Sequence, residues 1–121
     1  MQLSANPLNK NIEKQLTAML YGILSELSTP EEIAMVLGDL LTDVERTAMI
    51  KRLGIAVYLD KGRSYEDIKN NIKVSSATVA SVAGALGNEG WQEMIKRIKA
   101  EEWAEQWTDK ISKGIKRILP L

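Results

Sequence analysis

Apolar residues recur every three or four positions along most of this chain, which places them on one face of an α-helix. The first such stripe predicts a helix from Asn9 to Leu27. No segment shows the two-residue alternation that is typical of a half-buried strand, so the pattern predicts an all-α fold. The stripe of this first helix consists of Ile12, Leu16, Met19 or Leu20, Ile23, Leu24 and Leu27.

Two capping boxes, in which a threonine is followed three positions later by a glutamate, predict where the next two helices begin. The box at 29–32 also has Pro30 at the first helical position and opens a short helix that reaches Gly38. The box at 42–45 opens a helix through Leu59, in which Gly54 indicates the close approach of another helix. The core positions expected in this helix are Val44, Ala48, Met49, Leu53, Ala56, Val57 and Tyr58 or Leu59.

Residues 64–86 show the pattern of a helix-turn-helix, two short helices joined by a tight turn. Ser64 and Ser75 stand where the two helices need caps, and Lys73 stands in the turn, where glycine is usual because φ is positive. The second helix of such a unit commonly enters the DNA major groove, but similar pairs of helices also occur in ordinary helical domains. The apolar positions expected to be buried are Ile68, Ile72, Val74, Val79 and Val82.

A last amphipathic helix is predicted from Trp91 to Leu119, after a helix-breaking cluster at 87–90. Its apolar stripe has one irregularity, at 100–102, and we expect the stripe to pack on the core or on a dimer partner. The basic far end could also touch a membrane surface or the DNA backbone, although the acidic first half argues against a membrane role. The stripe consists of Met94, Ile95, Ile98, Trp103, Trp107, Ile111, Ile115 and Ile118.

The composition narrows the class of protein. A chain of 121 residues is expected to form a single domain over 1–121, and the sequence has neither a signal peptide nor a membrane-spanning run, which predicts a cytoplasmic protein. Cysteine and histidine are absent, and no phosphate loop, metal-ligand spacing or nucleophile–base pair is present. We therefore expect that the protein is not an enzyme and that it has no metal site and no cofactor.

The formal net charge of the chain is zero, whereas a DNA-binding domain usually carries a basic surplus.

The order of the motifs resembles the tryptophan repressor superfamily, and within it the YerC/YecD-type repressor-like group. The resemblance covers roughly residues 37–90, and its most specific parts are LT-x-x-ER at 41–46, with Arg52 downstream, and A-T-V at 77–79, after the turn. It implies an intertwined helical homodimer with two DNA-binding heads, and thus a repressor-like regulator of transcription that binds double-stranded DNA. In this scheme residues 9–60 form the core and dimerisation helices. Residues 64–86 form the helix-turn-helix, and residues 91–119 form an amphipathic extension.

Tryptophan-responsive members of the superfamily hold the indole ring between two arginines beside the head. The resemblance assigns this effector pocket to Leu41, Thr42, Arg52 and Thr78, with Arg52 as the first arginine. Ser81 stands at the position where those members have the second arginine, and Val82 stands where they have the glycine that follows it. Because a serine cannot stack on a ring as a guanidinium does, tryptophan is not expected to act as a co-repressor of this protein.

The second helix of the head carries no charged residue, which leaves two functions open. In the first, its hydroxyl and methyl groups contact bases, while cations before it, with Lys61 and Arg63 as further donors, hold phosphates. In the second, the chain keeps the repressor fold, has lost DNA binding and contacts another protein through this small uncharged surface. The first function assigns DNA contacts to Lys69, Lys73, Ser75, Ser76, Thr78 and Ser81.

Overall fold

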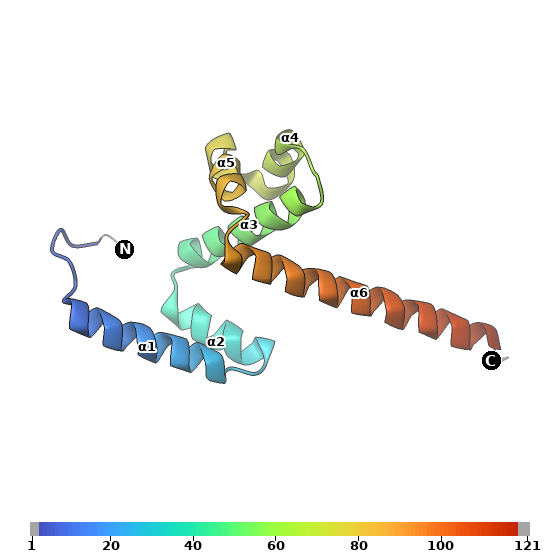
Figure 1. The fold of residues 1–121 in the computed structure, drawn as a ribbon, viewed down its shortest axis with the longest axis horizontal. Helices are drawn as coiled ribbons and strands as arrows, with labels where there is room; N and C mark the ends of the chain where they lie inside the picture. The colour runs from blue at the N-terminus through green and yellow to red at the C-terminus, as the bar shows by residue number, and fades with distance from the viewer. Residues whose placement is uncertain (1–2, 119–121) are drawn as a thin grey trace. The chain divides into compact units, whose positions relative to one another are not determined.

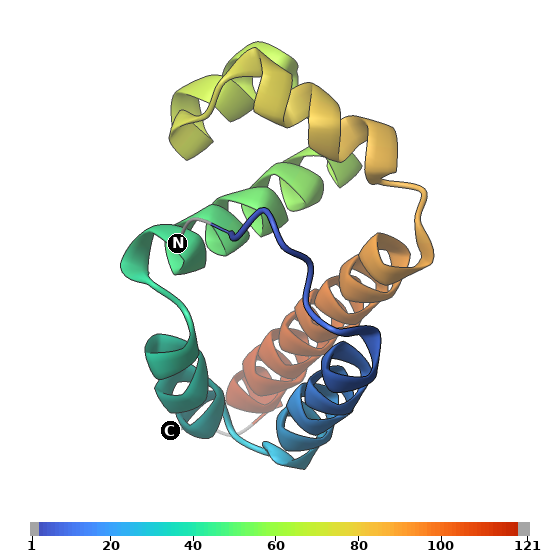
Figure 2. The same cartoon turned by 90° about the vertical axis from the view of Figure 1, so that its left-hand side faces the viewer.

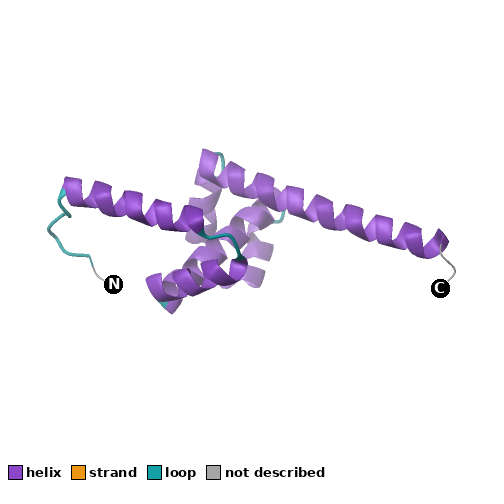
Figure 3. Ribbon diagram, turned by 90° about the horizontal axis from the view of Figure 1, so that it is seen from below, coloured by secondary structure: helices purple, strands orange, loops and turns teal. Residues whose placement is uncertain are grey.

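A computed structural model describes the backbone of residues 3–118 and the side chains of these residues apart from 106–111 and 114–118. Within this range every regular element is helical, which confirms the all-α fold class (Figure 3). Leu119, the predicted end of the last helix, lies outside the described residues. The elements are α1 (Lys10–Glu26), α2 (Pro30–Leu40), α3 (Asp43–Asp60), α4 (Tyr65–Ile68), the π-helical turn η1 (Lys69–Lys73), α5 (Ser76–Ala85) and α6 (Glu89–Ile118) (Figure 1).

The predicted caps are present at the helix starts. The Thr29 hydroxyl accepts a hydrogen bond from the backbone N–H of Glu32 at 3.1 Å, at the start of α2. At the start of α3 the Thr42 hydroxyl accepts from the Glu45 N–H at 3.1 Å, and the Thr42 N–H donates to the Glu45 carboxylate at 2.9 Å. The reciprocal pair at Thr42 and Glu45 is a complete capping box, so local sequence alone fixes where α3 begins.

The chain divides into two compact units, Met1–Arg46 and Thr47–Leu121. The first unit contains α1 and α2, and neither helix contributes a buried residue. Its apolar stripe is open to solvent: Ile12 is 48% exposed and Leu16 is 50% exposed. The helical spacing of this stripe was predicted correctly, but none of its residues is buried.

The second unit has a core of its own. Ile55 and Ala56 from α3, Ile68 from α4, and Val79 and Val82 from α5 are buried together. We call this part, residues 55–86, the head; Figure 2 shows α5 lying over α3 within it. Partly buried residues packed against this core are Tyr58, Leu59, Ile72, Val74, Leu86 and Trp91.

The apolar pattern of residues 64–86 predicted this core correctly, because Ile68, Val79 and Val82 are buried and Ile72 and Val74 pack beside them. The pattern within α3 was less accurate. Val44 is 80% exposed and Met49 is half exposed, whereas Ile55, which was not among the predicted positions, is fully buried.

The close approach of η1 to α3 explains which end of α3 is buried. A Cβ atom at Gly54 would lie 3.1 Å from Cδ1 of Ile72, so the absence of a side chain permits this close approach. The close approach predicted at Gly54 is therefore confirmed. It brings η1 onto the end of α3 that carries Ile55 and Ala56, and leaves Val44 and Met49 in the half of α3 that precedes the head.

Two helix ends differ by two residues from the predicted ones. Helix α2 continues through Gly38 to Leu40, and α6 begins at Glu89, before the predicted Trp91. The Asn88 carbonyl accepts the N–H of Gln92 at 3.0 Å, so the first turn of α6 forms within the predicted breaker cluster. Helix α6 packs against the head through Ile95, which is 5% exposed, and then continues well past the head (Figure 1).

Candidate functional site

The turn between η1 and α5 has an unusual backbone conformation. Lys73 has a φ of 62°, in the left-handed region, where a residue with a side chain is strained by about 1–2 kcal/mol. The ammonium group of Lys51, on α3, donates a hydrogen bond to the Lys73 carbonyl at 2.9 Å. The contact holds the turn against α3 and places a second lysine beside it. Sequence analysis missed Lys51, because nothing local connects it to a residue 22 positions further along the chain.

The start of α5 is fixed by the predicted cap. The Ser75 hydroxyl accepts a hydrogen bond from the Thr78 N–H at 3.2 Å and lies 2.9 Å from the Thr78 hydroxyl. Ser75 and Thr78, both predicted to contact DNA, are therefore also bonded to each other. Thr78 is half-buried, so its hydroxyl is less accessible than those of Ser76 and Ser81.

The outer face of α5 is exposed and uncharged. Val79 and Val82 point into the core. The helical period therefore directs the residues on the opposite side of α5 towards solvent. The exposed residues of this face are Ser76, Ala77, Ala80, Ser81 and Gly84.

Two of the cations suggested as phosphate donors are bound within the protein. Lys61 forms an ion pair with Glu102 at 3.2 Å. The Arg63 guanidinium lies 2.7 Å from the Asp67 carboxylate and 4.9 Å from the ring centroid of Tyr58, where a cation is attracted to the ring face. These contacts reduce the positive charge that Lys61 and Arg63 offer to a ligand.

Lys69 and Lys73, the other two predicted phosphate contacts, are held less firmly. The Lys69 ammonium is 4.0 Å from the Glu66 carboxylate, at the limit of an ion pair. Lys73 is exposed at the turn, where its carbonyl is bonded to Lys51. The positive charge closest to the start of α5 along the chain therefore comes from Lys73, with Lys51 beside it.

The residues of the predicted effector pocket divide between the two units. In the second unit, Arg52 lines an apolar groove of about 340 Å³, whose lining does not include Thr78. Leu41 and Thr42 belong to the first unit, where Leu41 caps the end of α2 and Thr42 caps α3. The other residues that line the groove are Met49, Ile50, Leu53, Trp91 and Met94.

The capping box at Thr42 also has an electrostatic effect. The Thr42 N–H, and after it the Thr42 hydroxyl, lower the pKa of Glu45 below its ordinary value of 4.5. The carboxylate thus stays ionised at the N-terminus of α3, where a negative charge interacts favourably with the helix dipole.

The described residues hold no group of three or more histidine, cysteine, aspartate or glutamate side chains placed to bind a metal ion. No helix among them is long and apolar enough to cross a membrane.

Comparisons with known proteins agree with the resemblance noted in the sequence. A family model described as "Trp repressor protein" matches residues 14–99. An uncharacterized protein of Bacillus subtilis (strain 168), YerC, is 32% identical over 91 residues, which span 74% of this chain and 86% of that protein. No solved structure matches the chain significantly. The matched residues include α2 to α5 and end within α6, so the second half of α6 lies outside the family match.

Proposed function

This chain belongs to the Trp repressor family, and on that premise we propose that it is a DNA-binding regulator of transcription that acts as a homodimer. The observation that carries the proposal is the exposed outer face of α5, presented by a head that buries its own core. In this proposal α4, η1 and α5 form a helix-turn-helix, and α5 enters the major groove. The two heads of a dimer would then bind successive major grooves, about 34 Å apart.

The residues of the outer face of α5 suit direct contact with base edges. Serine and threonine hydroxyls can donate to or accept from any base, and alanine methyl groups can contact the methyl group of thymine. Ser76 and Ser81 are exposed and supply hydroxyls, and Ala77 and Ala80 supply methyl groups. Thr78 is assigned a smaller role, because its hydroxyl is bonded to Ser75.

Phosphate contacts come from the turn in this proposal. The Lys51 ammonium lies 2.9 Å from the carbonyl of Lys73, the exposed lysine just before the cap of α5, and Lys69 lies on the preceding turn. The first N–H groups of α5 add a partial positive charge, which favours a phosphate at the helix N-terminus. Phosphate contacts of this kind position the head on DNA without selecting a sequence.

The homodimer follows from the apolar surface of the first unit. Neither α1 nor α2 buries a residue, although α1 carries a regular apolar stripe that includes Ile12, Leu16 and Met19. A stripe of this width is normally covered by another helix. The apolar groove of the second unit, with Met49 and Ile50 on its edge, is a further surface that a second copy can cover.

Tryptophan is not assigned as an effector. Arg52 is exposed beside the apolar groove, but Ser81 offers no guanidinium to stack on the other face of an indole ring. We expect calorimetry to show no tryptophan binding at millimolar ligand. Binding at micromolar concentration would overturn the match of Ser81 to the second arginine of the family.

DNA binding is tested by selection from a random duplex library at low salt, followed by a mobility-shift titration of the selected duplex. Replacement of both Lys69 and Lys73 by alanine should weaken binding to all sequences and reduce the salt slope by about 2, one for each lost phosphate contact. Ser81→Ala should change sequence preference more than affinity. Lys14→Ala, on α1, is the matched control and should leave the salt slope unchanged.

A second candidate function is favoured by the lack of charge on α5. In this alternative the head is a protein-interaction module that has kept the fold and lost DNA binding. Non-specific DNA binding normally reaches dissociation constants of about 10⁻⁴–10⁻⁶ M. Absence of any shift at 10⁻⁴ M protein and low salt would overturn the DNA-binding proposal and leave the interaction module.

A further inference from the structure

The connection between η1 and α5 is short and depends on one strained residue. Lys73, the last residue of η1, has a φ of 62°, and only Val74 and Ser75 separate it from the first residue of α5. Glycine is usual at such a position because it adopts a positive φ without strain. A residue with a side chain keeps this conformation only where the surrounding structure holds it. The turn of this chain therefore needs support from outside.

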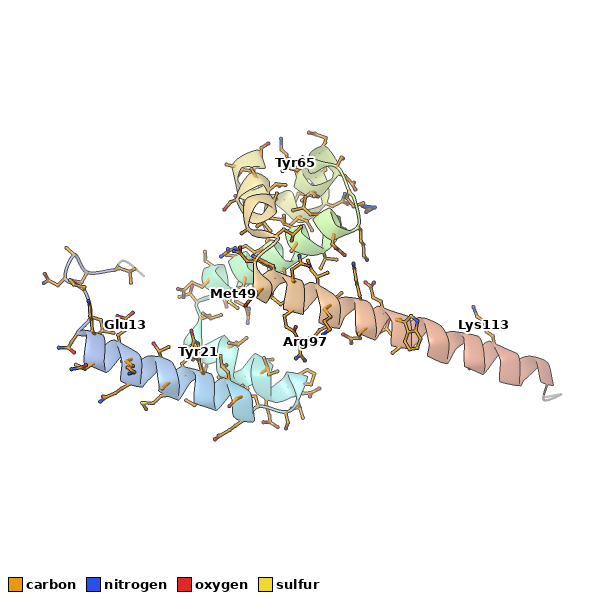
Figure 4. The ribbon with its side chains drawn as sticks, in the orientation of Figure 1. Glu13, Tyr21, Met49, Tyr65, Arg97 and Lys113 are labelled. Carbon is orange, nitrogen blue, oxygen red and sulfur yellow. The ribbon has the colours of Figure 1, made fainter. Side chains whose placement is uncertain are left out.

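Lys51, on α3, gives the turn this support. Its ammonium group donates a hydrogen bond to the Lys73 carbonyl at 2.9 Å, and the residue is half-buried. The last carbonyl groups of a helix have no N–H partner within that helix, and a hydrogen bond from a charged donor is stronger than one from a neutral donor. Figure 4 labels Met49, which lies two residues before Lys51 on α3. Lys51 thus reaches from α3 to the end of η1.

Gly54 provides a second point of contact on α3. It lies three positions after Lys51, so the two residues are neighbours on the helix surface. A Cβ atom at Gly54 would lie 3.1 Å from Cδ1 of Ile72, which packs here. The last two residues of η1, Ile72 and Lys73, are therefore held by two neighbouring positions of α3, one by packing and the other by a hydrogen bond. Two separate contacts fix the direction in which the chain leaves η1.

The direction of the chain after η1 determines how α5 is presented. Val74 packs against the buried core of the head, and the Ser75 hydroxyl accepts a hydrogen bond from the Thr78 N–H at 3.2 Å. The cap of α5 therefore comes only two residues after the carbonyl that Lys51 holds. A change of backbone conformation at Lys73 would displace the start of α5 and, with it, the exposed outer face of that helix.

We propose that Lys51 is a positioning residue for α5. Its hydrogen bond holds the left-handed turn that a glycine would form without help, and so fixes the orientation in which α5 meets its ligand. Lys51 acts on DNA binding through the backbone of the turn, and not as a contact to phosphate. Its effect on DNA affinity rests on the proposed function, whereas its effect on the turn and on the start of α5 does not.

Amide hydrogen exchange, followed residue by residue by NMR in the full-length protein, tests the turn without DNA. The Thr78 and Val79 amides report on the start of α5, because both donate to Ser75. Lys51→Met keeps an unbranched side chain but removes the donor, and should speed exchange of these two amides at least about fivefold. Lys51→Arg keeps a charged donor and should stay within about twofold of the parent. Lys96→Met makes the same exchange at an exposed position of α6, and as the matched control it should have no effect.

The strain at Lys73 allows a second comparison. In a Lys73→Gly background the turn is left-handed without strain, so Lys51→Met should speed exchange of the same amides by less than about twofold. Equal acceleration in both backgrounds, no acceleration in the parent, or failure of Lys51→Arg to protect these amides would overturn the proposal. So would equal acceleration at the Ile55 amide, within α3, because the variant would then only lower the overall stability.

The consequence for DNA binding is measured by mobility shift, on the duplex selected in the test of the proposed function. Lys51→Met should weaken binding at least about threefold, because α5 is less preorganised, and Lys51→Arg should restore it. The salt slope should stay that of the parent, and a slope reduced by about 1 would identify Lys51 as a phosphate contact and overturn the positioning role. If the parent binds no DNA, the proposed function fails, and the exchange measurements still decide whether Lys51 positions α5.

Discussion

The head and the first unit are built from equally well-formed helices but differ in what they bury. In the head, Ile55, Ile68 and Val79 from three different elements have no exposed surface. In the first unit, α1 and α2 bury no residue. Both regions have side-chain caps at their helix starts, for example Asn9 before α1 and Ser64 before α4.

This difference in burial shows that a well-formed helix and a stable one have separate requirements. Caps and apolar spacing determine where a helix begins and which face it will bury. Independent stability requires that this face meets other apolar residues, because an isolated helix of this length is marginal in water. The head meets this requirement through its own buried residues, whereas α1 and α2 have none, and the proposed dimer would cover them with a second copy.

The largest expected effect comes from a matched pair of isoleucine truncations. Ile68→Ala removes a fully buried side chain from the head and should lower the free energy of unfolding by about 2–5 kcal/mol. Ile33→Ala, on α2, changes a side chain that is 40% exposed, and should change the stability by less than about 0.5 kcal/mol in dilute protein. Urea denaturation, followed by circular dichroism at two protein concentrations, measures both. Equal losses would show that the two units are not distinct in stability.

The next effect is expected on association. Leu16→Asp places a charge in the middle of the α1 stripe, where Leu16 is half exposed in the single chain. Since burial of a leucine side chain contributes about 1.5–3 kcal/mol, the dissociation constant of the proposed dimer should rise at least tenfold. Sedimentation equilibrium measures the change, and Glu13→Gln, also on α1, is the control. A dimer that tolerates Leu16→Asp would show that the α1 stripe is not its interface.

The same comparison explains what the sequence could predict about the fold. Residues 64–86 were predicted closely because their caps and apolar positions are local and their core is formed mainly by themselves. The buried face of α3 was predicted less well. It depends on where η1 crosses, at Gly54, and that crossing joins residues far apart in the sequence.

The candidate site shows the same limit. The pattern correctly placed Ser76 and Ser81 on an exposed face, because the helical period decides this. It could not show that Lys61 and Arg63 are held by Glu102 and Asp67, nor that Lys51 reaches the Lys73 carbonyl. Two of these three contacts, those of Lys61 and Lys51, join residues far apart in the sequence, so their partners depend on the packed fold.

A smaller effect, in the stabilising direction, is expected at the turn of the head. Lys73→Gly relieves a left-handed conformation, and after the added freedom of the unfolded chain is subtracted it should raise the stability by about 0.5–1 kcal/mol. Lys73→Ala keeps a Cβ atom and therefore the strain, so it should not stabilise the head. Both variants should weaken DNA binding equally if the lysine contacts phosphate. Loss of stability in Lys73→Gly would show that the lysine side chain holds the turn in place.

The smallest effect is expected from the charge of Glu45 at the start of α3, where the two units meet in the sequence. The pKa of Glu45 is lowered in the folded state, so its contribution to stability is present above pH 4.5 and is lost as the pH falls below that value. The free energies of unfolding of Glu45→Gln and of the parent should therefore become more similar as the pH is lowered from 6 to 3.

Thr42→Ala is the comparison variant, because it removes the hydroxyl but keeps the N–H that lowers the pKa of Glu45 most. It should lower the free energy of unfolding by about 1 kcal/mol and retain most of the parent's pH dependence. Urea midpoints at several pH values measure both variants. A difference between Glu45→Gln and the parent that is constant with pH would show that the capping carboxylate adds nothing through its charge, and that the start of α3 depends on hydrogen bonding alone.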